Sequence, residues 1–465
     1  MRLVVAVGCL FALTLPTAAS AVGITQPVGN GRCYRTETVG TCTKARGLLG
    51  SDAIVVSPDN KNVYVASGPD SFGALAAFRR NRATGALTQL AGTAGCTSND
   101  GRSDHELPSS KTCAKGGVGL GGLSDVAISA DGKTVYAVST FPAVDTFRRN
   151  TTTGALTLLQ CFTAAAEDGC TAAAIQQPNS VTPSADGTTL FVGGEELSTF
   201  TLNPDGTIAG TGTCVAVLGT DPYDGCASAP RAAGLVRIGS LTAAPDGSRL
   251  YATAYFAGRL QQIPLTANVP QVDAATCFGT HTGCTPTAGA VNVHDVAVAA
   301  DGSGVYTAAS HFRQTNEESG GGYYASSAIG AFTGPDLAPL AGAQACALFG
   351  PPNVKPRPCG ATPAARGKGF AGANAVALTP DGRTLVGVFD KAVALLKRDP
   401  VTQSLTPVPG KQGCLASSNK RVKPTPATGC GVGVQIGIPQ AVAIAPDGRS
   451  AYTAGYDGVT VLRLR

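Results

Sequence analysis

The stretch Ser129–Ser139 reads SADGKTVYAVS, and six variants of it occur elsewhere in the chain. Each copy has a small residue, then x-Asp-Gly (Asp-Asn in one copy), then an apolar-aromatic run. Glycine after Asp favours a tight hairpin turn because it adopts positive φ at little cost, and the runs on either side are typical of β-strands. The turn aspartates are Asp59, Asp131, Asp186, Asp246, Asp301, Asp381 and Asp447.

Each copy predicts four strands. In the second copy, Val126–Ile128 before the turn is strand A and Val135–Val138 after it is strand B. Ala143–Phe147 is strand C, and Thr153–Leu159, which follows it and contains a second Gly turn, is strand D. Four antiparallel strands repeated seven times predict an all-β fold, a seven-bladed β-propeller.

The two ends of the chain predict closure of this ring. The chain ends after a strand C, at 459–463, with no strand D behind it. The segment Val22–Gln26 resembles the strand-D segment Gly85–Gln89. We therefore expect the N-terminal strand to complete the last blade, which removes the open sheet edges of a linear array. One propeller domain is expected over residues 22–465.

Residues 1–21 have the features of a signal peptide. Arg2 precedes an apolar stretch from Leu3 to Leu15, and Ala19-Ser20-Ala21 offers a cleavage site. The stretch is too short for a stable transmembrane anchor. We therefore expect a secreted or periplasmic protein without membrane insertion. The 60 glycines and 30 prolines agree with a chain of many short strands and turns.

Fourteen cysteines follow the predicted signal peptide, and they fall into seven close pairs. An even number in an exported chain predicts disulfides, and no pair has the separation of about two to four residues of a zinc knuckle. Each bridge would close a short loop and stabilise the fold by about 2–3 kcal/mol. The predicted bridges are Cys33–Cys42, Cys96–Cys113, Cys161–Cys170, Cys214–Cys226, Cys277–Cys284, Cys346–Cys359 and Cys414–Cys430.

The charge pattern excludes a nucleic-acid footprint. The formal net charge of +5 is spread over 465 residues without a block of basic residues. Three basic pairs each follow a strand C, and we expect their charged ends to lie in solvent and keep the hairpin ends soluble. These pairs are Arg79-Arg80, Arg148-Arg149 and Lys397-Arg398.

The repeated S-P-D-G-x-x-V-Y-V unit and the T-G-x-L-T strand resemble those of the lactonase-like, YVTN-type propeller family. The resemblance covers essentially the whole mature chain and implies the seven-bladed fold. It leaves two kinds of function open, because this family includes lactone-processing enzymes and non-enzymatic binding proteins.

Polar residues at the starts of the A strands predict a ligand site at the mouth of the central channel. These polar residues lie six or seven positions before the turn aspartates, where the A strands are expected to begin. The alternative is that these groups cap strand ends and bind water. The candidate ligand-binding residues are Asp52, Asp125, Asn179, His294, Asp295, Asn374 and Gln440.

The same positions assign no catalytic residue. By resemblance, a lactone-processing member uses His, Arg and Glu at the channel mouth, whereas His294 has no Glu or Arg beside it in these positions. The segment Gly117–Gly122 spells a dinucleotide fingerprint, but it lies in a cysteine loop before a strand, with no helix to receive a pyrophosphate. We expect no cofactor, with room for a structural cation at the channel mouth.

These observations predict a secreted, non-catalytic binding or scaffold propeller that is a monomer. Its partner would be a small molecule or an extracellular macromolecule. The alternative is a lactonase-like hydrolase or isomerase that acts on a sugar-derived lactone at the channel mouth.

Overall fold

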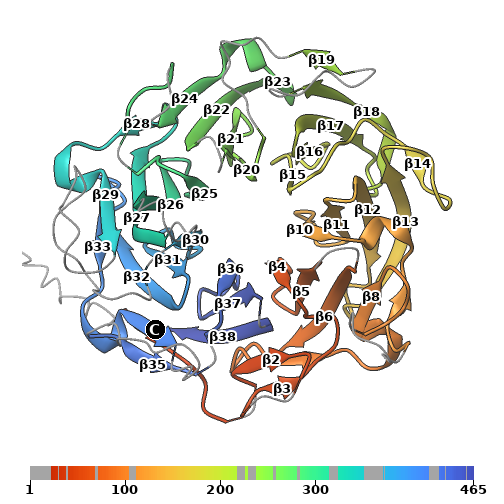
Figure 1. The fold of residues 1–465 in the computed structure, drawn as a ribbon, viewed down its shortest axis with the longest axis horizontal. Coiled ribbons are helices and arrows are strands. Elements are labelled where there is room, and N and C mark those ends of the chain that lie inside the picture. The colour runs from red at the N-terminus through yellow and green to blue at the C-terminus, as the bar shows by residue number, and fades with distance from the viewer. Residues whose placement is uncertain are drawn as a thin grey trace, which may run out of the picture.

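A computed structural model describes residues 22–29, 31–37, 40–68, 72–103, 111–216, 226–228, 237–254, 258–279, 283–287, 289–313, 323–349, 370, 372–417, 429–434, 436–456 and 458–465. These residues form a ring of seven β-sheets around a central opening (Figure 1). The predicted seven-bladed propeller is confirmed. The predicted signal peptide and Cys359 lie outside the described residues. None of the helical segments in the described ranges has the length and apolarity to cross a membrane.

The innermost strand of each blade is strand A, and strand B pairs with it antiparallel (Figure 1). The A strands are β4 (Ser51–Val56), β10 (Leu123–Ile128), β15 (Ser180–Pro183), β20 (Ser240–Ala243), β25 (Val293–Val298), β30 (Ala373–Leu378) and β36 (Pro439–Ile444). The B strands are β5 (Asn62–Ser67), β11 (Thr134–Ser139), β16 (Thr189–Gly193), β21 (Arg249–Ala254), β26 (Gly304–Arg313), β31 (Thr384–Phe389) and β37 (Ser450–Gly455).

Strand C follows, and strand D is a single strand in two blades and two separate strands in the other five. The C strands are β6 (Ala74–Arg80), β12 (Ala143–Arg149), β17 (Glu196–Leu202), β22 (Arg259–Thr266), β27 (Tyr323–Thr333), β32 (Ala392–Arg398) and β38 (Gly458–Leu464). The single D strands are β13 (Leu156–Thr163) and β18 (Ile208–Ala216). The divided ones are β7 (Leu87–Gln89) with β8 (Cys96–Ser98), β23 (Val269–Pro270) with β24 (Thr276–Gly279), β28 (Ala338–Pro339) with β29 (Cys346–Phe349), β33 (Leu405–Pro407) with β34 (Cys414–Ser417) and, in the last blade, β1 (Ile24–Thr25) with β2 (Cys33–Arg35).

The ring closes through the N-terminal segment, as the sequence predicts. β1 (Ile24–Thr25) and β2 (Cys33–Arg35) both pair antiparallel with the last strand, β38. Ile24 lies opposite Leu464, and Tyr34 lies opposite Val459. The first and last segments therefore share one sheet, which gives the ring no open edge at this point.

The A–B turns explain why the turn Asp is followed by Gly in six copies and by Asn in one. The residue after the turn Asp has φ between 63° and 71° in all seven copies, including the single non-glycine, Asn60. Asn tolerates this left-handed conformation better than other non-glycine residues. The Asp side chain accepts hydrogen bonds within the turn, as Asp59 does from Ser57 Oγ at 2.7 Å and from the Lys61 backbone N–H at 3.2 Å.

Six of the seven predicted disulfides join described cysteines, and all six are present. Five of them link the D strand to an additional short strand that runs parallel to it at the outer edge of the blade. In Cys214–Cys226, for example, the cysteines directly precede the paired residues Val215 and Ala227. These outer strands are β3 (Thr43–Lys44), β9 (Ala114–Lys115), β14 (Thr171–Ala172), β19 (Ala227–Ser228) and β35 (Gly431–Gly433). In the sixth, Cys277–Cys284, a single parallel bridge takes the place of the strand.

The prediction for the three basic pairs is wrong for the second residue of each pair. Arg79, Arg148 and Lys397 are exposed, but the alternation of a strand turns the next side chain inward. Arg80, Arg149 and Arg398 are only 3–4% exposed. Each binds the turn aspartate of the preceding blade. The N–O distance is 3.0 Å in Arg80–Asp447, 2.9 Å in Arg149–Asp59 and 3.4 Å in Arg398–Asp301.

The tyrosine of strand B completes this contact between blades. Tyr64 is fully buried, and its hydroxyl donates to the Gly154 carbonyl of the next blade at 2.7 Å. Arg149 Nε in turn donates to that hydroxyl at 3.0 Å. Tyr452 and Tyr306 make the equivalent contacts with Arg80 and Arg398. We refer to these three Asp–Arg–Tyr groups as the inter-blade latches.

Candidate functional site

The A strands bring the predicted polar residues to the channel, and several of them connect neighbouring blades. Asn179 Nδ2 donates to the Ile238 carbonyl at 3.0 Å, and Asn374 Nδ2 donates to the Pro439 carbonyl at 2.9 Å. Ile238 lies just before the A strand of the next blade, β20, and Pro439 is the first residue of the A strand β36. These amides therefore fix one blade to the next and keep a side-chain oxygen as an acceptor.

Asp125 is bound in the same way. It accepts hydrogen bonds from the Val126 N–H at 2.7 Å, from Ser180 Oγ at 3.0 Å and from the Val181 N–H at 2.9 Å. Ser180 and Val181 belong to β15, in the next blade. Burial raises the pKa of the Asp125 carboxyl, although these hydrogen bonds oppose the shift. The carboxyl therefore joins two blades.

Asp295 joins three blades. Its carboxylate accepts from Ser240 Oγ at 2.8 Å, from the Val296 N–H at 2.9 Å and from the Val376 N–H at 3.0 Å. These donors lie on β20, β25 and β30. Burial, and to a smaller extent the charge of Asp125, raises the pKa of the Asp295 carboxyl to about 6.

The neighbouring His294 is half-buried, and burial lowers the pKa of its imidazole to about 4. It is therefore neutral near pH 7 and has the protonation state of a base. Within the described residues, no three Asp, Glu, His or Cys side chains at the mouth bring ligand atoms within 4.8 Å of one another.

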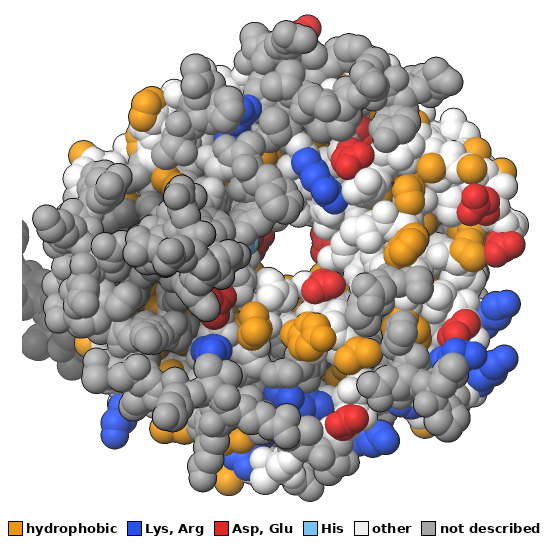
Figure 2. Space-filling model, in the orientation of Figure 1, with side chains coloured by type: hydrophobic (Ala, Val, Ile, Leu, Met, Phe, Trp, Pro, Cys, Tyr) orange, Lys and Arg blue, Asp and Glu red, His pale blue; other side chains and the backbone are white. Residues whose placement is uncertain are grey.

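Asp52 and Gln440 are the exposed members of the predicted set. Asp52 is open to the channel, but the protein that flanks it removes part of its hydration. This desolvation raises the pKa of the Asp52 carboxyl to about 7. The space-filling view shows acidic side chains around the central opening (Figure 2). Asp52 is thus a carboxyl that solvent and a ligand can reach.

One side of the mouth is hollowed to about 360 Å³. Of the predicted residues, the structure places Asp52 and Asn179 in its wall. The other five lie outside it, namely Asp125, His294, Asp295, Asn374 and Gln440. The wall also contains Ser124, Thr140, Arg237, Ile238 and Gly239. A hollow of this size falls in the range of small-molecule sites.

Arg237 is the first of two residues that the sequence analysis did not identify. It precedes β20 at a position outside the six- and seven-residue count, because the loop before this A strand carries it into the mouth. Its guanidinium is exposed, and Nη2 donates to Gln177 Oε1 at 2.9 Å. The sequence feature that could have pointed to Arg237 is an arginine directly before a predicted A strand.

A second missed residue is Asp145, on strand C of the second blade. It is fully buried, and neither carboxyl oxygen has a hydrogen-bond partner among the described residues. Desolvation raises the pKa of this carboxyl to about 8. A Cβ at Gly119 would lie 2.5 Å from Asp145 Oδ1, so the glycine-rich segment that resembles a dinucleotide fingerprint allows the backbone to pass close to this acid.

No protein-family model matches the chain, and no curated protein sequence is significantly similar to it. Several solved structures share its fold. The periplasmic gluconolactonase of Pseudomonas aeruginosa is 17% identical with a TM-score of 0.53, over 86% of this chain and 91% of that one. Hydrazine synthase of Kuenenia stuttgartiensis is 12% identical with a TM-score of 0.51, over 92% of this chain and 99% of that one.

A putative 6-phosphogluconolactonase of Bacteroides fragilis is 16% identical with a TM-score of 0.49, over 97% of this chain and 99% of that one. At 12–17% identity, the similarity to the gluconolactonase and to hydrazine synthase shows the fold alone, and one fold hosts unrelated activities.

Proposed function

We propose that the protein is an exported propeller that binds a small, acidic, polyhydroxylated molecule, such as a sugar acid, without transforming it. The observation that carries this proposal is the hollow of about 360 Å³ at the channel mouth, in which Asp52 and Arg237 line the same wall. The six disulfides support an extracellular or periplasmic location, because disulfides persist in oxidising compartments.

The chemistry of the wall selects the ligand class. A guanidinium has five N–H donors that match a carboxylate, and Arg237 gives one nitrogen to Gln177. Ser124 Oγ donates its hydrogen to the Pro178 carbonyl at 2.9 Å, and Asn179 donates to Ile238. The oxygens of Ser124 and Asn179 therefore remain acceptors, and Asp52 adds another. One cation among several acceptors suits a molecule with one acidic group and several hydroxyls.

The other mouth carboxylates are engaged in hydrogen bonds between blades, and this favours binding over catalysis. Asp125 and Asp295 each accept three hydrogen bonds and hold adjacent blades together. A general acid or base must reach the reacting group, and His294 and Asp295 do not line the hollow.

A lactonase is the second candidate. It is favoured by the fold similarity to the periplasmic gluconolactonase and by the neutral His294 at the mouth. In that case the chain would hydrolyse a sugar lactone, with His294 as the base.

Calorimetric titration of the purified protein with sodium gluconate, and separately with glucose, tests the binding proposal. We expect gluconate to bind and Arg237→Gln to weaken its binding by about tenfold or more, which corresponds to the loss of a charged hydrogen bond. Arg148→Gln, an exposed arginine far from the hollow, is the matched control and should bind as the wild type does. Equal affinities in wild type and Arg237→Gln would refute the site.

Hydrolysis of glucono-δ-lactone, followed at constant pH against a protein-free blank, separates the two candidates. We expect no acceleration over the blank. Turnover that His294→Ala abolishes and Arg148→Gln leaves unchanged would replace the binding proposal with the lactonase.

A further inference from the structure

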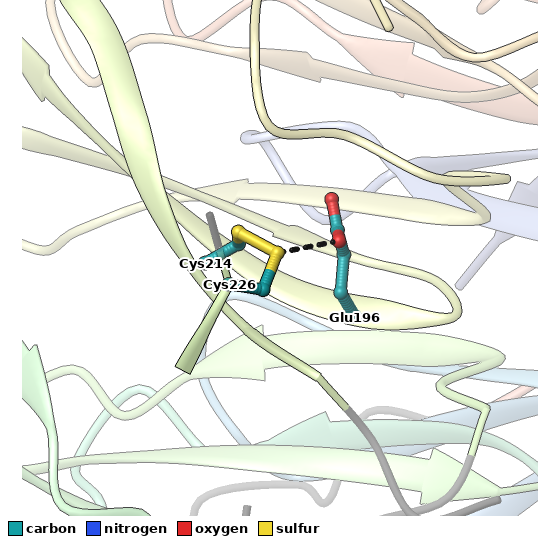
Figure 3. Close-up of side chains that lie close together, drawn as sticks. All are labelled: Glu196, Cys214 and Cys226. Carbon is teal, nitrogen blue, oxygen red and sulfur yellow. Dashed lines mark hydrogen bonds between the residues drawn. A yellow bond between two sulfur atoms is a disulfide. The ribbon is translucent and has the colours of Figure 1, made fainter. Parts of the chain in front are cut away.

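A buried carboxyl contacts one of the disulfides. Glu196, the first residue of β17, is 3% exposed, and its side chain points at the Cys214–Cys226 bridge (Figure 3). Glu196 Oε2 lies 3.1 Å from Cys226 Sγ. Ser198 Oγ donates to the other carboxyl oxygen, Oε1, at 3.0 Å. The carboxyl is therefore fixed in place against the sulfur.

This arrangement distinguishes the third blade from the sixth. In the sixth blade, Ala392 and Ala394 stand opposite Ala416 and Cys414 on β34, where Glu196 and Ser198 stand opposite Ala216 and Cys214 on β18. Cys414–Cys430 has the same exposure pattern as Cys214–Cys226, with a buried first and a half-buried second cysteine. Among the described residues, Glu196, Cys214 and Cys226 form the only group of three or more His, Cys, Asp or Glu side chains whose polar or sulfur atoms all lie within 4.8 Å of one another. Within the described part of blade six, the matched disulfide therefore has no carboxyl beside it.

The contact favours the protonated form of Glu196. Both sulfurs are in the disulfide and carry no hydrogen, so Oε2 can hydrogen-bond to Cys226 Sγ only when the carboxyl is protonated and donates. Burial, the larger cause, and the neighbouring charge of Glu195 raise the pKa of Glu196, whereas hydrogen bonds from Ser198 and Gln176 lower it. The neutral acid is thus stabilised beside the sulfur.

We propose that Cys214–Cys226 is a thiol–disulfide exchange site, in which Cys226 is the exchanging sulfur and Glu196 transfers a proton to and from it. Cys226 is half-buried, whereas Cys214 is 5% exposed, so an incoming thiolate reaches Cys226 first. The partner is a reduced thiol, either a small molecule or a dithiol on a protein surface. This activity is separate from ligand binding at the channel mouth.

The exchange proceeds in two displacements. The first thiolate bonds to Cys226 Sγ, the bond between the two cysteine sulfurs breaks, and its electron pair goes to Cys214 Sγ, which takes a proton from water. A second thiolate then bonds to the sulfur of the first reductant molecule. The electron pair of the mixed disulfide returns to Cys226 Sγ, which takes the proton of Glu196 Oε2, and solvent reprotonates the carboxylate. The products are the dithiol and the oxidised reductant.

The protonation state of Glu196 sets the rate of both displacements. A neutral carboxyl does not repel the incoming thiolate in either displacement, and in the second it supplies the proton that Cys226 Sγ takes. An ionised carboxylate 3.1 Å from Cys226 Sγ repels the thiolate and has no proton to give. The reactivity of Cys214–Cys226, relative to a disulfide without a carboxyl, should therefore fall as pH rises.

Timed reduction with dithiothreitol between pH 5 and 9, followed by acid quench, differential alkylation and mass spectrometry, tests the proposal. The readout is the ratio of the reduction rate of Cys214–Cys226 to that of Cys414–Cys430 in the same sample, because the ionisation of the reductant cancels in this ratio. In the wild type we expect the ratio to exceed one at low pH and to fall by about tenfold as pH rises, the equivalent of one pKa unit of repulsion.

Two variants separate proton transfer from a purely structural role. Glu196→Gln keeps the shape but cannot ionise, so its ratio should not change with pH. Ser198→Ala removes the donor to Oε1, so the fall of the ratio should move to higher pH. A wild-type ratio that is constant with pH, or a Glu196→Gln variant that keeps the wild-type pH dependence, would overturn the proposal.

Discussion

The A–B turn face and the channel-mouth face both depend on aspartates, but the two sets have opposite electrostatics. At the turns, Asp59, Asp301 and Asp447 have lowered pKa values, because turn hydrogen bonds and a buried arginine of the next blade favour the charged form against the cost of desolvation. At the mouth, Asp52 and Asp295 have raised pKa values because burial dominates. The same side chain is therefore held in the charged form at one face and stays protonatable at the other.

This difference between turn and mouth aspartates indicates which positions of the ring can carry a functional site. A latched turn aspartate such as Asp59 has a charged partner from the adjacent blade, and changing it disturbs the ring. At the mouth, Asp295 also binds neighbouring blades, whereas Asp52 belongs to no latch among the described residues and lines the hollow. Asp52 is thus a position whose chemistry can change without breaking an inter-blade latch.

Removing a latch should have the largest effect. Arg149→Ala leaves Asp59 and the Tyr64 hydroxyl without their buried partner, and breaking a buried pair in this way costs about 3–5 kcal/mol. Denaturant unfolding at pH 7 measures it. Arg148→Ala, the exposed neighbour, should change the free energy of unfolding by less than about 0.5 kcal/mol. Similar losses in both variants would remove the distinction between a latch and a surface charge.

Asp145 should dominate the pH dependence of stability above pH 4. Its folded-state pKa of about 8 lies above the ordinary value of 3.8, so the folded protein binds one more proton between these pH values. Its contribution to the free energy of unfolding therefore decreases by about 1.4 kcal/mol per pH unit across that window. Asp145→Asn cannot titrate, and its unfolding free energy should fall less steeply with pH.

Asp131→Asn is the control for that measurement. Asp131 is an exposed turn aspartate whose pKa is lowered by the Ser129 and Lys133 contacts despite some desolvation. Its contribution to stability is present above the ordinary pKa and is lost only as the solution is acidified below it. The difference between wild type and Asp131→Asn should therefore be constant from pH 5 to pH 8. A steep difference there would mean that the turn face also titrates.

Asp52→Asn should have the smallest effect on stability when the carboxyl is protonated in both states. The side chain is exposed, so we expect a change of less than about 0.5 kcal/mol in denaturant unfolding at pH 3.5. As pH rises from the ordinary pKa of 3.8 to about 7, the difference should increasingly favour the variant, because the folded state disfavours the ionised carboxyl. A loss above about 1 kcal/mol would show that Asp52 is structural, like the turn aspartates, and would weaken the mouth as a ligand site.

The fold was predictable because its decisive signals are local. The Asp-Gly turn needs a residue with positive φ next to a hydrogen-bonding Asp, and both lie within a few positions of each other. The close cysteine pairs and the strand-D likeness of residues 22–26 also required no knowledge of distant contacts. The outer parallel strands could not be predicted, because two or three residues carry no periodicity.

The candidate site was predictable only in part, because its chemistry depends on neighbouring blades. Counting along the repeat placed Asp52 and Asn179 at the mouth, where they line the hollow. It could not show that the carboxyl of Asp295 is bound by groups of β20 and β30, far away in the chain. Nor could it show that Arg80 is buried against Asp447 at the opposite end of the chain. These contacts arise only when the ring has closed.

The disulfides have a further consequence for how this scaffold can vary. Each described bridge spans between 7 and 17 residues in sequence while keeping its Cα atoms 4.7–4.9 Å apart. The segment inside a bridge is thus anchored at a constant width, whatever its length. Mutation can lengthen or rewrite one such segment without shifting the adjacent A strand. The bridges therefore let segments of different length stand around the rim of one constant frame.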